Sequence, residues 1–225
     1  MKINLPTKIT LSRIIASFLL ILAIIVIYIV DQYIPFVSNA NFKIGENVTM
    51  NWIMLILFFV FLVASLTDFL DGYLARKNNE VTDLGKFLDP IADKMLVNSM
   101  LIFLSLNFVS LNNSLNEQLM KFPFFLVILM IIRDLVVDGL RLMAAKKNIV
   151  ISANIFGKLK TVLQMVSISL VFLNGFPFSF FDYGFNPYLK ITTIFCYLTT
   201  LASLISGIIY VIQNRFVFIG GKNNE

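Results

Sequence analysis

The sequence predicts an all-α polytopic membrane protein with six transmembrane helices and a short N-terminal interfacial helix. Composition supports this first: 58% of the 225 residues are apolar and 14% are charged, whereas soluble domains carry roughly a quarter charged residues. The apolar residues also gather in runs long enough to cross a bilayer, and Lys and Arg gather at alternate connections between these runs. We expect residues 1–225 to form a single membrane domain.

The apolar runs define the spans in chain order. A spanning helix needs about 20 largely apolar residues, and six segments qualify: about 14–30, 52–74, 91–110, 122–143, 161–178 and 190–212. Before the first span, the segment after Pro6 predicts the interfacial helix. The first run exceeds a usual signal-peptide core and no small-x-small cleavage site follows it, so we expect it to be retained.

Basic residues orient these spans. The positions on one side are Lys2, Lys8, Arg13, Arg76, Lys77, Lys86, Lys94, Arg141, Lys146, Lys147, Lys158, Lys160, Arg215 and Lys222. The other side carries only Lys43, Lys121 and Lys190. The positive-inside rule therefore predicts a multi-pass protein of the cell membrane, with both termini and the charged connections in the cytoplasm.

Missing residue types exclude several kinds of chemistry. The chain has no His and one Cys, which rules out Ser-His-Asp and Cys-His nucleophiles, His-ligated zinc and an intrachain disulfide. The cysteine, Cys196, lies in an apolar run and reads as a small core residue. The formal charge of +5 suits an anionic membrane surface or a phosphorylated substrate.

Acidic residues at the end of the second span are the first candidate site, because carboxylates near a span are costly and usually functional. In a helix, positions 68, 71, 72 and 75 have the spacing i, i+3, i+4, i+7. Asp68 and Asp71 then share a face with Gly72 and Ala75, two residues that leave room for a ligand.

A second acidic pair opens the third span. Asp89 and Asp93 are one helical turn apart, and Gly85 precedes them by one turn if the helix extends that far back. Pro90 favours a first helical turn, so Asp89 is alternatively the N-cap of this span.

The two pairs are expected to face each other, because a short connection joins neighbouring antiparallel helices. Four unpaired carboxylates would repel one another, and hard divalent cations remove that repulsion. We predict a site for Mg²⁺ or Mn²⁺, with two ions balancing the four charges. The alternative is that these acids are caps or form salt bridges with Arg76, Lys86 and Lys94.

Asp68-x2-Asp71-Gly72-x2-Ala75-Arg76-x8-Gly85-x3-Asp89-x3-Asp93 resembles, without a gap, the signature of the CDP-alcohol phosphatidyltransferase family. The resemblance implies transfer of a phosphatidyl group from a CDP-linked lipid to an alcohol, with release of CMP, in a homodimer. It implies that Asp68, Asp71, Asp89 and Asp93 bind the metals and that Asp93 is the general base. It further implies that Gly72, Ala75, Arg76 and Gly85 accommodate or contact the CDP group.

The acceptor is predicted from a second stretch. Residues 133–141 and 157–161 resemble the corresponding parts of bacterial phosphatidylglycerophosphate synthases, whose acceptor is glycerol 3-phosphate. Candidate ligands of its phosphate are Arg133, Arg141, Lys158 and Lys160, since arginine binds phosphate bidentately and lysine adds a point charge. Alternatively, the lysines only mark the cytoplasmic side, and Arg133 is neutralised by Asp134 or Asp138. These two acids depart from the synthase pattern.

These resemblances thus imply a phosphatidylglycerophosphate synthase activity, with CDP-diacylglycerol, glycerol 3-phosphate and the bilayer as partners and no nucleic acid. One alternative keeps the chemistry with phosphatidylglycerol, inositol phosphate or serine as acceptor. Another is a divalent-cation transporter, and a third is a catalytically silent paralogue. Direct attack of the acceptor on phosphorus and a carboxylate-linked intermediate both stay open.

Overall fold

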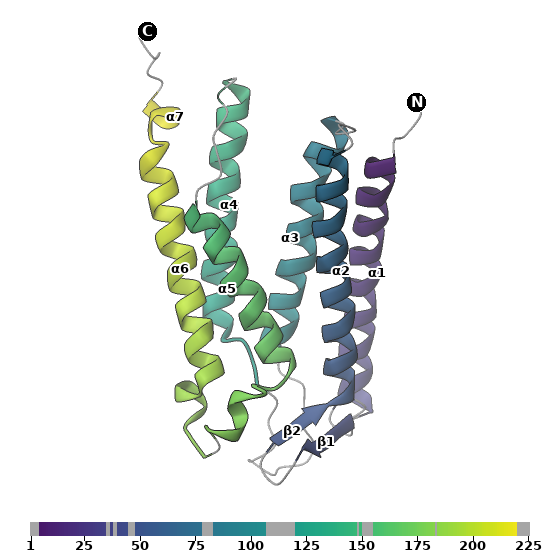
Figure 1. Cartoon of the computed structure of the whole chain (residues 1–225). Coiled ribbons are helices and arrows are strands. Elements are labelled where there is room, and N and C mark those ends of the chain that lie inside the picture. Colours follow the sequence, from purple (N-terminus) through teal and green to yellow (C-terminus); the bar gives the residue numbers. More distant parts are fainter. Residues whose placement is uncertain are drawn as a thin grey trace. The chain divides into compact units, whose positions relative to one another are not determined.

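The computed structural model describes residues 5–34, 37, 40–44, 48–77, 83–106, 120–147, 149, 155–182 and 184–219, with backbone alone for 5–10, 13, 32, 68–77, 83–90, 93 and 218–219. The long helices are α1 (Leu5–Tyr33), α2 (Trp52–Lys77), α3 (Asp83–Ser105), α4 (Phe124–Lys146), α5 (Ile155–Phe172) and α6 (Ile191–Gln213) (Figure 1). The short elements are β1 (Asn41–Ile44), β2 (Val48–Asn51), η2 (Phe178–Phe180), η3 (Pro187–Leu189) and α7 (Phe216–Ile219). The prediction of a mainly helical chain is confirmed, and each predicted span overlaps one long helix.

Within the described residues, three helices are long and apolar enough to cross a membrane. The stretches are Ile14–Asp31 of α1, Ile155–Phe172 of α5 and Ile191–Gln213 of α6. Only 17% of the first stretch is buried inside the protein, and large apolar side chains such as Phe18 and Leu19 are more than half exposed. Such surface is stable in lipid and not in water, so the chain is a membrane protein.

The predicted separate N-terminal interfacial helix is wrong. Helix α1 runs without a break from Leu5 to Tyr33, 29 residues, or about 44 Å at 1.5 Å per residue. Pro6 is its second residue, a position where proline's missing N–H costs no helical hydrogen bond. Residues 7–13 contain no glycine or further proline to end the helix.

The start of α3 resolves the two readings of Asp89. Helix α3 begins at Asp83, so Asp89 and Pro90 are its seventh and eighth residues. Asp89 is therefore not an N-cap, and the alternative based on Pro90 is wrong. Gly85 is inside the helix, one turn before Asp89, as the other reading required.

The chain divides into two compact units, and the first contains residues 1–121 and 171–183. In this unit α1 packs against α2 and α3. The ring of Phe172 lies 6.1–6.4 Å from those of Phe58, Phe61 and Phe103. These ring contacts give α2 and α3 a common aromatic core.

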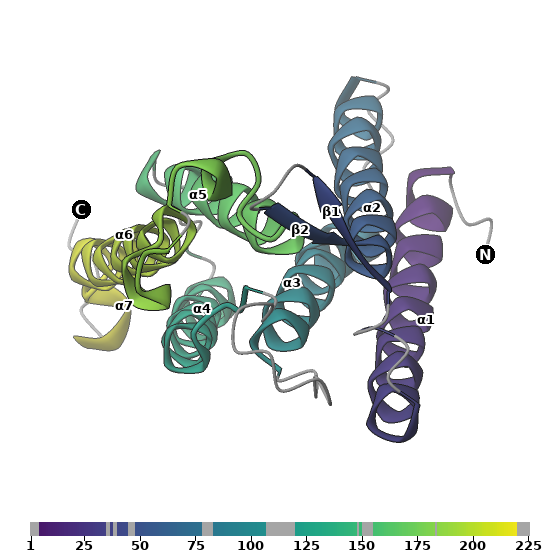
Figure 2. The ribbon, with the colours of Figure 1, turned by 90° about the horizontal axis from the view of Figure 1, so that it is seen from below.

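An antiparallel hairpin of β1 and β2 precedes α2 in the first unit (Figure 2). Asn51, the last residue of β2, accepts hydrogen bonds from the backbone N–H groups of Ile53 and Met54 and so caps α2. The side-chain amide of Asn174 donates to the Thr49 carbonyl at 2.7 Å. The hairpin was absent from the sequence prediction, because its strands are only four residues long.

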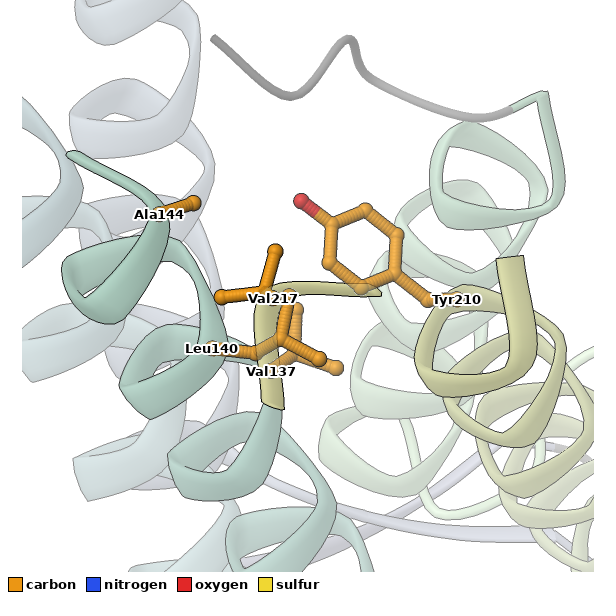
Figure 3. Close-up of a cluster of buried hydrophobic side chains, with 5 residues drawn as sticks. All are labelled: Val137, Leu140, Ala144, Tyr210 and Val217. Atoms are coloured by element: carbon orange, nitrogen blue, oxygen red, sulfur yellow. The ribbon is translucent and has the colours of Figure 1, made fainter. Parts of the chain in front are cut away.

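The second unit contains residues 122–170 and 184–225, with α4 packed against α6 and α7. Its buried apolar cluster consists of Val137, Leu140, Ala144, Tyr210 and Val217 (Figure 3). The inward face of α6 is otherwise mainly hydroxyl and small residues: Thr192, Thr193, Cys196, Thr199, Thr200, Ser203, Ser206 and Gly207. Small residues allow close helix approach and hydroxyls bond across helices, as in membrane bundles.

Candidate active site

The first group of candidate residues lies at the end of α2. Because α2 is helical throughout Trp52–Lys77, the predicted spacing puts Asp68, Asp71, Gly72 and Ala75 on one face within its last three turns. Arg76 follows at the penultimate residue of the helix. The backbone thus places two acids beside two positions with little or no side chain.

The second acidic pair lies in the first half of α3. Gly85, Asp89 and Asp93 are spaced by four residues and therefore share one helix face. Residues 78–82 join the end of α2 to the start of α3, and the two helices run side by side in opposite directions (Figures 1 and 2). Both acidic pairs therefore belong to the same end of the first unit.

This donor set suits hard divalent cations. Carboxylate oxygens are the preferred protein ligands of Mg²⁺ and Mn²⁺, and the glycines keep the adjacent helix surface open. The four side chains lie outside the described part of the structure. Among the side chains that are described, no three acids, cysteines or histidines cluster at metal-binding distance.

The predicted acceptor residues lie in the second unit, where two of them share one carboxylate. Arg133 Nη1 lies 2.8 Å from Asp134 Oδ1, and Lys160 Nζ lies 2.9 Å from each Asp134 oxygen. The three side chains are only 8–12% exposed. Arg133 and Lys160 are thus brought together, and Asp134, one of the two acids that the sequence left open as partners of Arg133, pairs with both.

Helix α6 fixes the direction of the Arg133 side chain. Its Nε donates to the carbonyl of Ser203 at 3.1 Å, and its Nη2 donates to Ser206 Oγ at 2.8 Å. Directly beside it, a Cβ built on Gly207 would lie 2.7 Å from Arg133 Cγ. Glycine at this position leaves the space that the arginine stem occupies.

The other two predicted cations have different surroundings. Arg141 Nε donates to Tyr210 Oη at 3.0 Å, and its guanidinium carbon lies 5.4 Å from the centre of the Tyr210 ring. Lys158 is exposed near the start of α5. Arg141 is therefore held two turns along α4 from Arg133. Lys158 lies two residues before Lys160 in α5 and is exposed, whereas Lys160 is buried.

A groove of about 260 Å³ opens between α4 and α6, beside Arg133 and Gly207. Aliphatic side chains line most of it: Val136, Val137, Leu204, Ile208, Val211 and Ile212. This lining suits a hydrocarbon chain and not a phosphate. The polar contacts of Arg133 instead involve Asp134 and the two serines.

Sequence reasoning missed the α6 residues that hold these cations. Ser203, Ser206 and Tyr210 are spaced by three and four residues and lie on one face, with Gly207 beside Ser206. Hydroxyl and small residues recurring at helical spacing in an apolar span were the available signal. No sequence pattern indicated which charged residue these side chains contact.

Comparison with known proteins covers most of the chain. Residues 3–211 match the profile of the CDP-alcohol phosphatidyltransferase family. A CDP-diacylglycerol–glycerol-3-phosphate 3-phosphatidyltransferase of Bacillus subtilis is 38% identical over 182 residues, covering 81% of this chain and 83% of the relative. An enzyme of the same name from Mycoplasma genitalium is 39% identical, covering 77% and 70%, and one from Mycoplasma pneumoniae is 37% identical, covering 78% and 74%.

Proposed function

The chain belongs to the CDP-alcohol phosphatidyltransferase family, and we propose that it transfers the phosphatidyl group of CDP-diacylglycerol to sn-glycerol 3-phosphate. The products are phosphatidylglycerol phosphate and CMP, which makes the protein a transferase of phospholipid biosynthesis. The observation that carries this assignment is the similarity to relatives of that name over at least 70% of each of the three relatives described above. The matched region, residues 3–211, includes the whole aspartate signature.

Enzymes of this family use divalent metals, and the four aspartates of α2 and α3 are the residues that would hold them here. Asp68, Asp71, Asp89 and Asp93 would hold two ions of Mg²⁺ or Mn²⁺ per site, and these ions would supply charge stabilisation for the diphosphate and the departing CMP. Gly72, Ala75, Arg76 and Gly85 accommodate the CDP group. The helix spacing of the four acids supports this arrangement.

Asp93 acts as general base toward the acceptor hydroxyl. As that proton moves to Asp93, the acceptor oxygen bonds to the lipid phosphorus, and the bond from this phosphorus to the bridging oxygen breaks. CMP leaves with the bridging oxygen and its electron pair. Attack is direct, since one displacement needs no further nucleophile.

Arg133, Arg141, Lys158 and Lys160 bind the acceptor's phosphate. The burial of Arg133 and Lys160 around one carboxylate supports this role, because charged groups inside a membrane bundle usually mark a substrate site. Arg141 lies two turns toward the α4 end that carries Lys146. Arg133, Arg141 and Lys146 thus follow one another along α4.

The six long helices cross the bilayer with both termini and the site in the cytoplasm. Three of them meet the length and hydropathy expected of a span, and the asymmetric Lys and Arg distribution supports the orientation of all six. Residues 1–225 act as one membrane domain, and two copies form a homodimer.

The test is CMP release from CDP-diacylglycerol by purified protein in detergent with Mn²⁺. We expect release with glycerol 3-phosphate, and not with phosphatidylglycerol, inositol phosphate, serine or no acceptor. Release only with another alcohol would overturn the acceptor assignment and keep the family chemistry. No release with any alcohol or metal would overturn the enzyme assignment, and cation flux in liposomes would then indicate a transporter.

A further inference from the structure

In the second unit, the buried side chains of Arg133 and Lys160 share the carboxylate of Asp134. Arg133 and Lys160 carry two positive charges and Asp134 one negative charge, so the three side chains together carry one positive charge. Two adjacent cations at 8–12% exposure would repel each other and lose their hydration. Asp134 therefore allows both to remain inside the helix bundle before any phosphate is bound.

The contacts of Arg133 leave part of its guanidinium available. Its bonds to Asp134, Ser203 and Ser206 use three of its five N–H groups among the described residues. Because these bonds come from two helices, the guanidinium plane is fixed on α4 and α6 together. Among the described residues, no contact uses the other two N–H groups, and two is the number that a bidentate phosphate contact requires.

Gly207 positions the Arg133 side chain through steric fit and not through charge. A methyl group there would lie 2.7 Å from Cγ and 3.1 Å from Nε of Arg133. Cγ is near the α4 backbone, so the arginine cannot avoid the methyl by moving only its tip. It would have to leave the rotamer that reaches the two serines.

We propose that Asp134 and Gly207 are positioning residues for acceptor binding: they hold Arg133, and through Asp134 also Lys160, in the geometry that receives the acceptor's phosphate. This inference rests on the proposed function. A preassembled cation pair lowers the cost of ordering these long side chains when the acceptor arrives. The effect of disturbing it is therefore confined to acceptor affinity, with donor binding unchanged.

The experiment measures KM for glycerol 3-phosphate, KM for CDP-diacylglycerol and kcat in Asp134→Asn and Gly207→Ala. We expect acceptor KM to rise about 10- to 100-fold in each, as for loss of one charge-assisted hydrogen bond. Donor KM should change by less than about twofold. Asp134→Glu, which keeps the charge, should recover most of the acceptor affinity.

Gly139→Ala is the matched control, because a Cβ at Gly139 on α4 meets no atom within 4 Å. It should keep the wild-type values. An unchanged or lower acceptor KM in folded Asp134→Asn or Gly207→Ala would overturn the proposal, as would an equal rise in donor KM. If Asp134→Asn does not fold, Gly207→Ala and Asp134→Glu decide the question.

Failure of the proposed function is read separately, from the acceptor panel with wild-type protein. Release of CMP only with a neutral alcohol would overturn this inference too, because no phosphate would then need Arg133. Release with a different phosphorylated alcohol would overturn the choice of glycerol 3-phosphate, and the variants would then be expected to raise KM for that alcohol.

Discussion

The two units hold their charged residues in different ways. In the first, four acids of the signature stand on two consecutive helices, at positions fixed by spacing within each helix. In the second, Arg133 of α4 and Lys160 of α5 share Asp134, and Arg133 is also held by two serines of α6, about 70 residues further along the chain. The acids form a pattern within single helices, and the cations form a network across three.

This contrast has a physical origin. An acidic cluster that awaits metal ions needs open space, and glycine and alanine at helical spacing supply it locally. A buried cation is unstable without a counter-charge before its substrate binds, so the protein must provide one. Asp134 is that counter-charge. Because one site has its own counter-charge and the other does not, we expect substitutions in the two units to change activity differently.

The largest expected effect is in the first unit. Asp89→Asn removes one of four carboxylates from the proposed metal site while keeping its size. We expect turnover to fall on the order of 1,000-fold, which corresponds to about 4 kcal/mol of lost transition-state stabilisation. The measurement is CMP release over a range of Mn²⁺ concentrations. Asp83→Asn, at the first residue of the same helix and outside the signature, should behave like wild type, and equal losses in both would remove the metal assignment.

The second effect tests the arginine fork in the second unit. Arg133→Lys keeps the charge but cannot bond Ser203, Ser206 and Asp134 at once. We expect kcat/KM for the acceptor to fall about 100-fold, the equivalent of one or two charged hydrogen bonds. Donor KM is the internal control. A fall caused by kcat alone would mean that Arg133 acts on the transition state instead of on acceptor binding.

The same contrast separates the features that the sequence predicted from those that it did not. The six long helices, the faces of Asp68 and Asp71 and the family were all predicted, because apolar length and helical period are local properties. The start of α3 was left open, because Pro90 is a weak guide to a helix boundary. The partners of Arg133 and Arg141 could not be predicted, because no local pattern states which helix packs beside α4.

Tyr210→Phe should have a smaller effect. It removes the hydroxyl that accepts from Arg141 Nε and keeps the ring beside the guanidinium and in the buried cluster (Figure 3). The loss of about 1 kcal/mol, typical of one hydrogen bond, predicts a roughly fivefold rise in acceptor KM. Tyr188→Phe, in the exposed η3 segment, is the control. No change in acceptor KM would separate Arg141 from the acceptor site and leave Arg133 and Lys160.

The smallest effect concerns the contact between α5 and α6 away from the cations. Thr199 Oγ1 lies 2.6 Å from Ser167 Oγ and bonds the Leu163 carbonyl at 3.2 Å. Thr199→Val keeps the shape and removes these bonds, which in membrane bundles contribute about 0.6 kcal/mol each. For a chain of this size that predicts a fall in Tm of about 2–4 °C, with acceptor KM unchanged. Ser203, which bonds Arg133, follows Thr199 by one turn of α6. A rise in acceptor KM would therefore mean that the hydroxyl face of α6 links Ser167 of α5 to Arg133 of α4 in one network. The network that distinguishes the second unit would then extend along α6 beyond the residues that touch the cations.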